Sequence, residues 1–409
     1  MNVPKLRFKE FTDEWKTHKL KDFFSKITKK NKSNSIHNVI SNSAKFGLVK
    51  QIDYFSKDIA NTDNTESYFI IEKNDFVYNP RKSLEAPFGP ICKYNYNETG
   101  IVSPLYLCFR CSQLINHDFF EYLFKSSVWY KYIYQNGDSG ARHDRVNIKD
   151  STFFLMPIFV PQSKEQEKIA KFLTTVDKKI TNLENTITSL ENQKKGLLQQ
   201  IFSQKLRFKD KNGNNYPNWE KKKLGNITQS QGGTALEKYT TTNGLYKFIS
   251  IGNYSTYSTY LDNGIRIDLN NKTKKQLLNK NDLVMILNDK TSSGNIIGRT
   301  LLIDKDNTYI YNQRSQRLIC NTKIIIPSFL YFLLNSDFRK NIIKKVQGAT
   351  QIYINYSTIE VMHLNIPCLE EQTKIADFLS AFDRKLDNQK AQLEHWKQIK
   401  KGLLQQMFV

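Results

Sequence analysis

The sequence repeats itself at a fixed distance of 206 residues. Residues 165–202 read EQEKIAKFLTTVDKKITNLENTITSLENQKKGLLQQIF, and residues 371–408 read EQTKIADFLSAFDRKLDNQKAQLEHWKQIKKGLLQQMF. Glu165 pairs with Glu371 and Phe202 with Phe408, with no gap between them. Both segments lack proline and hold a single glycine, so each predicts a long uninterrupted helix.

The apolar residues of each segment recur every seven residues in two columns, as in a coiled coil. The columns are Ile169, Val176, Leu183, Leu190, Leu197 with Leu173, Ile180, Ile187, Lys194, Ile201, and then Ile375, Phe382, Gln389, Trp396, Leu403 with Leu379, Leu386, Leu393, Lys400, Met407. At ~1.5 Å per residue, each helix is about 55–60 Å long. A lysine interrupts each seam at the same place, which is typical of a residue that fixes register. We therefore predict that the two helices pack on each other, antiparallel, within one chain.

A second signature gives the repeat a circular order. Lys5-Leu6-Arg7-Phe8-Lys9 and Trp15 open the chain, and Lys205-Leu206-Arg207-Phe208-Lys209 and Trp219 follow the central helix. After the C-terminal helix the same segment is expected at residue 411, beyond Val409. We infer that the N-terminal segment supplies what the C-terminal repeat lacks. This order predicts neighbouring termini and a pseudo-twofold molecule.

The predicted fold class is α+β: two tandem α/β domains separated by two long antiparallel coiled-coil helices, in a pseudo-twofold circular repeat. The expected boundaries are 1–20 for the N-terminal segment that completes the C-terminal repeat, 21–160 for the first variable domain, 161–204 for the central helix, 205–366 for a linking segment plus the second variable domain (from about 225), and 367–409 for the C-terminal helix.

Each variable domain shows short β-type runs with turn signals, then an aromatic helix and a polar loop. In the first domain we expect strands over 68–71, 76–78 and 101–110 and a helix over 117–135; in the second, a strand over 283–287 and a helix over 327–346. The framework recurs but the loops differ. That is the pattern expected of two similar modules that recognise two different ligands.

The charge balance favours a polyanionic partner. The chain has 61 Lys and Arg against 39 Asp and Glu, a formal net charge of +22, which attracts a polyanion and releases its counterions. A lysine-rich composition without functional meaning is the alternative. The 39% apolar and 12% aromatic content argues against wholesale disorder. The five cysteines, without an N-terminal apolar signal or an 18-residue apolar run, predict reduced thiols and a cytoplasmic protein.

No motif for chemistry stands out. The sequence has neither a phosphate-cradling GxxxxGK[ST] loop nor a strand–GxGxxG–helix dinucleotide site. Asn79-Pro80-Arg81-Lys82 lacks the second proline and the aromatic residue of an amino-methyltransferase loop. Cys108 and Cys111 form a CxxC without a second ligand pair for zinc, and are better interpreted as strand cysteines. We therefore expect no catalytic residue and no metal site.

The candidate DNA-binding residues are polar side chains on the loops of the variable domains, where they can reach phosphates and base edges. They are Arg81, Lys82, Arg142, His143, Arg145, Lys290, Arg299, Arg314, Arg317, Gln351 and Tyr353. Solvated surface charge is the alternative for each one. A second set lies on the helices but off the seam, and it fits either contact with the adjacent domains or docking of another subunit: Phe172, Leu198, Phe202, Phe378, Leu404 and Phe408.

The whole chain resembles the specificity subunit of Type I restriction–modification systems. The resemblance rests on the repeated Pro-x3-EQ-x-K-I-A-x-FL start of each helix, from Pro161 and from Pro367, and on the Lys-Lys-Gly-Leu-Leu-Gln-Gln ends at 194–200 and 400–406. It also rests on the order variable domain, helix, variable domain, helix.

This resemblance implies a non-catalytic, sequence-specific DNA-binding subunit in the bacterial cytoplasm, at the nucleoid. Each variable domain is then a target recognition domain that reads one half of a bipartite, gapped site in double-stranded DNA, and the helices set the gap. Two methyltransferase subunits dock on the helices, and restriction (translocase) subunits join them for host defence. No cofactor is expected in this chain; S-adenosylmethionine, ATP and Mg²⁺ belong to those partners. The alternatives are a fused or degenerate methyltransferase or nuclease, and a nonspecific nucleic-acid-binding coiled-coil scaffold.

Overall fold

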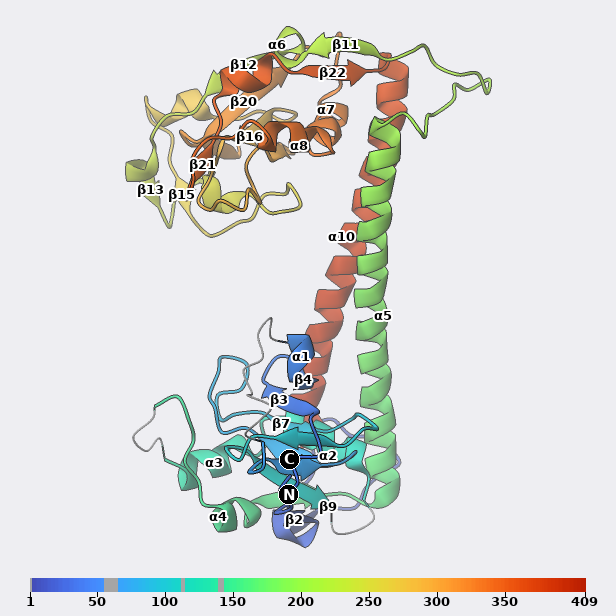
Figure 1. The fold of residues 1–409 in the computed structure, drawn as a ribbon, viewed down its shortest axis with the longest axis vertical. Coiled ribbons are helices and arrows are strands. Elements are labelled where there is room, and N and C mark those ends of the chain that lie inside the picture. Colours follow the sequence, from blue (N-terminus) through green and yellow to red (C-terminus); the bar gives the residue numbers. More distant parts are fainter. Residues whose placement is uncertain (1, 55–64, 112–114, 139–142) are drawn as a thin grey trace. The chain divides into compact units, whose positions relative to one another are not determined.

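The computed structural model describes residues 2–54, 65–111, 115–138 and 143–409. The chain divides into two compact units, the first made of Met1–Glu184 with Ala391–Val409 and the second of Asn185–Lys390. Each unit holds one variable domain together with one portion of each long helix. The predicted fold class is confirmed, with two α/β domains and two long helices that pack against each other (Figure 1).

The first domain is built on two four-stranded sheets. One sheet, which we call the inner sheet, has the strand order β2-β9-β6-β7, and all its neighbouring strands are antiparallel. In the outer sheet the order is β4-β3-β8-β5, and β3 runs parallel to β8. The bounds are β2 Phe24–Lys26, β3 Val39–Ser43, β4 Gly47–Lys50, β5 Phe69–Ile71, β6 Phe76–Tyr78, β7 Ile91–Lys93, β8 Gly100–Val102 and β9 Leu107–Cys111.

The second domain repeats this plan with the order β12-β20-β16-β18 in its inner sheet and β13-β15-β14-β19 in its outer sheet. Here β14 runs parallel to β19, as β3 does to β8. The bounds are β12 Thr228–Gly232, β13 Thr240–Thr241, β14 Tyr246–Ile249, β15 Arg266–Ile267, β16 Leu283–Ile286, β18 Thr300–Leu302, β19 Tyr309–Tyr311 and β20 Ser315–Cys320. The same turn introduces both β6 and β16, because Asn74 and Asn281 adopt positive φ angles of 74° and 71°.

Short elements complete each domain. The antiparallel pairs β1–β10 and β11–β22 lead into the long helices, and β17 pairs with β21. The bounds are β1 Lys16–Lys19, β10 Pro157–Val160, β11 Glu220–Lys223, β22 His363–Ile366, β17 Asn288–Asp289, β21 Ile352–Tyr353, α1 Gln51–Tyr54, α4 Asp150–Phe154, α6 Leu224–Ile227 and α9 Tyr356–Glu360.

Three sequence predictions need correction. The helix expected over 117–135 is two helices, α2 (His117–Lys125) and α3 (Tyr130–Asn136), and that expected over 327–346 is α7 (Pro327–Leu334) and α8 (Phe338–Ile343). Both break at a serine whose hydroxyl bonds a carbonyl three residues back, Ser126 to Leu123 and Ser336 to Leu333, each at 2.6 Å. The side chain thereby competes with the helical backbone bond. The run over 101–110 is split between β8 and β9.

The long helices are α5 (Ser163–Phe202) and α10 (Leu369–Gln406), which lie antiparallel and side by side (Figure 1). Within the first unit Lys400 bonds Asp177 at 2.6 Å and Lys397 bonds Glu184 at 2.7 Å. Within the second unit Lys194 bonds Asp383 at 2.5 Å and Lys390 bonds Glu191 at 2.7 Å. The residues of both predicted seams are buried or half-buried throughout. Each seam lysine is therefore neutralised by an aspartate of the other helix.

The circular repeat is confirmed at the chain ends, which lie close together in the first unit (Figure 1). The backbone N–H of Leu6 donates to Gln406 O at 2.9 Å, as that of Leu206 donates to Gln200 O at 3.1 Å. Arg7 donates two hydrogen bonds to the buried carboxylate of Glu165, from Nε at 2.7 Å and from a terminal nitrogen at 2.8 Å. Arg207 clasps Glu371 in the same way.

Candidate nucleic-acid interface

In the first domain a backbone bridge brings four candidate residues together. Arg81 and Arg145 form an isolated antiparallel bridge. On either side of it, the Lys82 N–H donates to Asp144 O at 2.8 Å and the Val146 N–H to Pro80 O at 2.9 Å. We call residues 80–82 and 143–146 the first bridge. It holds Arg81, Lys82, His143 and Arg145, which the sequence placed in two separate loops.

Local geometry fixes this bridge. The side chain of Asn79 accepts a hydrogen bond from the Arg81 N–H at 3.0 Å and donates one to Asn42 O at 2.9 Å. Gly89 has φ +83°, and a Cβ there would lie 2.0 Å from Asn79 O. Only glycine permits this close backbone approach, which folds the loop after β6 back onto its own start.

The first bridge is electropositive. It carries three cationic side chains, on Arg81, Lys82 and Arg145, and one carboxylate, Asp144, which lies 3.9 Å from Arg81. The Arg81 side chain is 69% exposed. Tyr106 is half-buried beside them; burial raises its pKa, although a backbone hydrogen bond from Asn42 and the charges of Arg145 and Arg81 act to lower it. An exposed guanidinium next to a tyrosine is well suited to phosphate contact.

The second domain has the same feature at the equivalent place. Asp75 corresponds to Asp282, and the same spacing takes Arg81 to Asn288. Asn288 pairs with Tyr353 through β17 and β21, and the Leu287 N–H donates to Arg314 O at 2.9 Å. We call residues 287–290 and 351–354 the second bridge. It holds the candidates Lys290, Gln351 and Tyr353, all exposed, and the candidate Arg314 adjoins it through its carbonyl oxygen.

The two bridges present different chemistry on one scaffold. The first carries guanidinium, ammonium and imidazole groups, and the second adds the amides of Asn288 and Gln351 and the phenol of Tyr353. An amide can both donate hydrogen bonds to base edges and accept hydrogen bonds from them, whereas a guanidinium group only donates and favours phosphate and guanine. Asn288 is not among the residues that the sequence singled out. The repeat spacing applied to Arg81 would have found it.

Arg317 lies at a different kind of position. Its side chain, 12% exposed, bonds Asp282 at 2.7 Å, just as Arg110 bonds Asp75 in the first domain. Each aspartate also accepts a hydrogen bond from the backbone N–H three residues before it, at 2.7 Å for Asp282 and at 2.6 Å for Asp75. The pair thus fastens β20 to the turn before β16, as its counterpart fastens β9 to the turn before β6.

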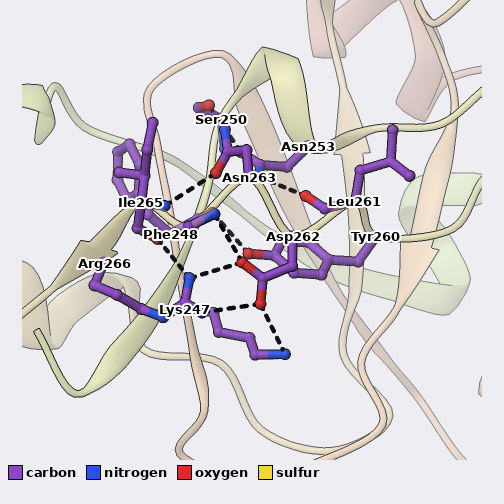
Figure 2. A network of polar contacts seen from close by, with 11 residues as sticks. Lys247, Phe248, Ser250, Asn253, Tyr260, Leu261, Asp262, Asn263, Ile265 and Arg266 are labelled. Carbon is purple, nitrogen blue, oxygen red and sulfur yellow. Dashed lines mark hydrogen bonds and ion pairs between the residues drawn. The ribbon is translucent and has the colours of Figure 1, made fainter. Parts of the chain in front are cut away.

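Two other cations of the second domain form ion pairs within the domain. Figure 2 shows Lys247 and Arg266 converging on Asp262, at 3.3 Å and 2.7 Å. Arg266 is the largest cause of the lowered pKa of Asp262, followed by the Gly264 N–H. Beside it the Asn253 side chain joins Ser250 to Leu261. This network fixes the loop between β14 and β15.

Two candidates remain. Arg299 is half-buried; its Nε donates to Asn295 O at 3.0 Å and a terminal nitrogen to Ser258 Oγ at 3.2 Å. Burial lowers its pKa. Arg142 lies outside the described residues.

The off-seam apolar residues divide into two groups. Phe172 and Phe378 are each 38% exposed and pack edge-on against Phe8 and Phe208. The other four, Leu198, Phe202, Leu404 and Phe408, contact the core of the adjacent domain. Phe408, for example, is 4% exposed and meets Trp15 and Phe119. Of the set, Phe172 and Phe378 are therefore the most accessible to another subunit.

Over the described residues, no group of three or more His, Cys, Asp and Glu is placed to hold a metal ion. In that same part of the chain no helix is long and apolar enough to cross a membrane. Cys108 and Cys111 lie in β9, where burial raises the pKa of the Cys108 thiol.

The chain matches one family model twice, over residues 12–192 and 216–395. That model is described as the Type I restriction modification DNA specificity domain. Together the two matches span well over half of the chain, and each contains one of the two bridges.

Two curated proteins are similar in sequence. The Type I restriction enzyme MjaVIII specificity subunit of Methanocaldococcus jannaschii is 26% identical over 281 residues, 63% of this chain and 62% of that protein. The Type I restriction enzyme HindI specificity subunit of Haemophilus influenzae is 30% identical over 139 residues, 33% of this chain and 29% of that protein. The matched part thus spans less than two thirds of the length of these relatives.

Two solved structures share the fold. The Type-I restriction-modification system S subunit from M. genitalium has a TM-score of 0.58 at 16% identity, covering 100% of this chain and 99% of that one. A chain from a study of complex assembly and conformational transition of the type I R-M system has a TM-score of 0.57 at 12% identity, covering 95% and 96%. At these identities the likeness is one of fold.

Proposed function

Because this chain belongs to the family of Type I restriction–modification DNA specificity subunits, we propose that it recognises a bipartite, gapped target in double-stranded DNA. Each domain reads one half-site through its bridge. The chain itself carries no catalytic residue. It directs methyltransferase subunits, and through them restriction subunits, to the target in the cytoplasm. S-adenosylmethionine, ATP and Mg²⁺ act in those partners.

The observation that supports this proposal best is the pair of bridges. The two domains share the strand order of their inner sheets, yet their equivalent bridges hold Arg81 with Arg145 in one domain and Asn288 with Tyr353 in the other. A conserved scaffold with exchanged polar groups is what reading two different half-sites requires. A nonspecific scaffold has no need for such a difference.

The formal net charge of +22 supports DNA as the partner. Phosphate neutralisation supplies affinity and fixes the position of the protein on the duplex, but it carries no sequence information. We assign this part to Arg81, the exposed cation of the first bridge, to its half-buried neighbours Lys82 and Arg145, and to Lys290. In this proposal the antiparallel helix pair is the spacer that sets the gap between the half-sites. Two half-sites on one face of the duplex lie about 34–36 Å apart, and this is the distance that the spacer has to span.

The test is single-molecule methylation mapping of DNA from cells that express this chain with its cognate methyltransferase subunit, against cells that lack this chain. We expect methylation at a two-part motif with a fixed gap, present only with this chain. An active methyltransferase that yields no such motif would refute the proposal. Exchange of residues 21–160 for those of a relative should then change one half-site and leave the other. A change in both halves would contradict the modular assignment.

A further inference from the structure

The loop after the second bridge exposes only polar side chains. Lys290, Thr291, Ser292, Ser293 and Asn295 are exposed, whereas Ile297 is fully buried. We call residues 290–295 the polar loop. Gly294 has φ +64°, and a Cβ there would lie 3.4 Å from the Ile352 side chain, so the loop rests against β21 of the second bridge.

Asp289 holds this loop from its base. Its carboxylate, 5% exposed, accepts hydrogen bonds from the Thr291 N–H at 3.1 Å, the Thr291 hydroxyl at 3.0 Å and the Ile296 N–H at 2.8 Å. Burial alone would raise the pKa of Asp289, but these donors outweigh it and the pKa lies below its usual value. The carboxylate is therefore charged and bound to both ends of the polar loop.

Arg339 of α8 holds the loop from behind. Its Nε donates to Ile297 O at 2.8 Å, and a terminal nitrogen donates to Gly294 O. Arg299 adds a bond to Asn295 O at 3.0 Å. Burial, then the charge of Arg299, lowers the pKa of Arg339 to about 10. Two neighbouring guanidinium groups thus donate hydrogen bonds to backbone carbonyls of one surface loop. These bonds offset the unfavourable burial of the two charges and the repulsion between them.

The exposed side chains of the loop are also ordered among themselves. The Thr291 and Ser293 hydroxyls lie 2.6 Å apart, and the Asn295 amide donates to Ser293 Oγ at 2.9 Å. Asn295 is exposed, and its amide also has an oxygen that can accept a hydrogen bond. The equivalent loop of the first domain differs in character, because its exposed residues include Glu85, Pro87 and Leu84, the last 99% exposed.

We propose that the polar loop is a further base-reading element of the second domain, beside the second bridge, with Ser292, Ser293 and Asn295 bonding base edges and Lys290 a flanking phosphate. Asp289 and Arg339 are positioning residues that fix the loop before DNA arrives. The ligand is the base edges of one half-site of duplex DNA, so this assignment rests on the proposed function. Amide and hydroxyl groups bond base edges directly, asparagine most specifically to adenine. A loop already rigid loses little conformational entropy on binding.

The test uses the full chain with its cognate methyltransferase subunit and compares S292A/S293A/N295A with T241A/T242A/N243A. Both sets remove two hydroxyls and one amide from exposed residues of the second domain. We expect the first variant to bind the cognate second half-site about tenfold more weakly, or worse, and to methylate a degenerate second half with an unchanged first half. The second variant should match the unaltered chain.

An unchanged second half-site in the loop variant, with a two-part motif in the unaltered chain, would overturn the loop assignment and leave the proposed function intact. Absence of that motif in the unaltered chain would instead refute the proposed function. For the positioning role, Arg339→Met should relax only the second half-site, and Arg339→Lys should restore part of the selectivity because it keeps a donor. Relaxation of both halves by Arg339→Met would contradict a positioning role.

Discussion

The backbone N–H of Leu6 donates a hydrogen bond to the carbonyl oxygen of Gln406 at 2.9 Å, and so joins the two ends of the chain. Its counterpart, between Leu206 and Gln200 at 3.1 Å, lies within continuous chain. The same contact is therefore made once across the termini and once along the backbone. Trp15 and Trp219 extend this equivalence, since each indole N–H donates to a glutamate in the first turn of a long helix, Glu165 or Glu371.

A circular permutant tests this equivalence. Five residues separate Gln200 from Leu206, whereas direct fusion of Val409 to Met1 leaves eight between Gln406 and Leu6, enough to span the same contact. With new ends at Lys211 and Asn212, in an exposed turn, the permutant should unfold within about 1 kcal/mol of the original chain, because loop closure depends weakly on length. Urea unfolding measures this. A permutant that fails to fold, while a chain nicked at the same turn folds, would contradict it.

Removal of Arg207 should destabilise the second unit strongly. Glu371 is fully buried and its carboxylate is bonded by Arg207 at 3.1 and 2.7 Å and by Trp219 at 3.1 Å. Arg207→Ala leaves that charge without its cation, at an expected cost of about 3 kcal/mol in unfolding free energy. Adding Glu371→Gln should recover part of the loss, since a neutral amide costs less to bury. Arg7→Ala is the matched variant in the first unit, and a loss below about 1 kcal/mol in both would contradict the prediction.

Each seam lysine should stabilise the helix pair through its ion pair with an aspartate of the opposite helix. Lys194 and Asp383 are 20% and 27% exposed and lie 2.5 Å apart. Lys194→Asp places two carboxylates at this point and should lower the unfolding free energy by about 1–3 kcal/mol. Lys194→Asp with Asp383→Lys restores the pair and most of the stability, and Lys400→Asp with Asp177→Lys is the matched pair in the first unit. If the double variant is no more stable than the single one, the ion pair is not the cause.

Acid should weaken the first domain through His117. Burial, then the charge of Lys93, lowers the pKa of His117 below its ordinary value, against the carboxylates of Asp118 and Asp75. Between that lowered pKa and the unfolded value of about 6.5, the unfolded chain binds the proton and the folded chain does not. Stability therefore falls as pH drops below about 6.5 and is unaffected above it. Urea midpoints at two pH values measure this, and His117→Gln should flatten the difference; an equal slope in the variant would contradict the assignment.

Insertion of four residues before Gln193, with a matched insertion before Asp387 at the facing position of the other helix, tests the helices as spacers. Four helical residues add about 6 Å, against about 3.4 Å per base pair. We expect the mapped motif to keep both half-site sequences and to widen its gap by one or two base pairs. Retained methylation with the original gap would show that the helices do not set the spacing.

The two long helices and the circular order follow from the sequence because they depend on local periodicity and on a repeat. Seam residues such as Leu173 and Leu379, both fully buried, are set by heptad spacing alone. Periodicity does not predict the helix breaks after Lys125 and Leu334, because each break depends on a hydrogen bond from a single hydroxyl, that of Ser126 or Ser336. Apolar periodicity continues across both breaks.

The candidate interface depends on tertiary structure. Charge and composition indicated loop cations, but only the folded chain separates Arg81 and Arg145, side by side at a bridge, from Arg317, fastened to Asp282. Nothing in sequence spacing links Arg339 to Gly294, which are 45 residues apart yet share a hydrogen bond. Residue type and period are local properties and can be taken from the sequence. Which cation meets a carboxylate, and which one meets solvent, is settled by contacts between distant segments that only the packed fold creates.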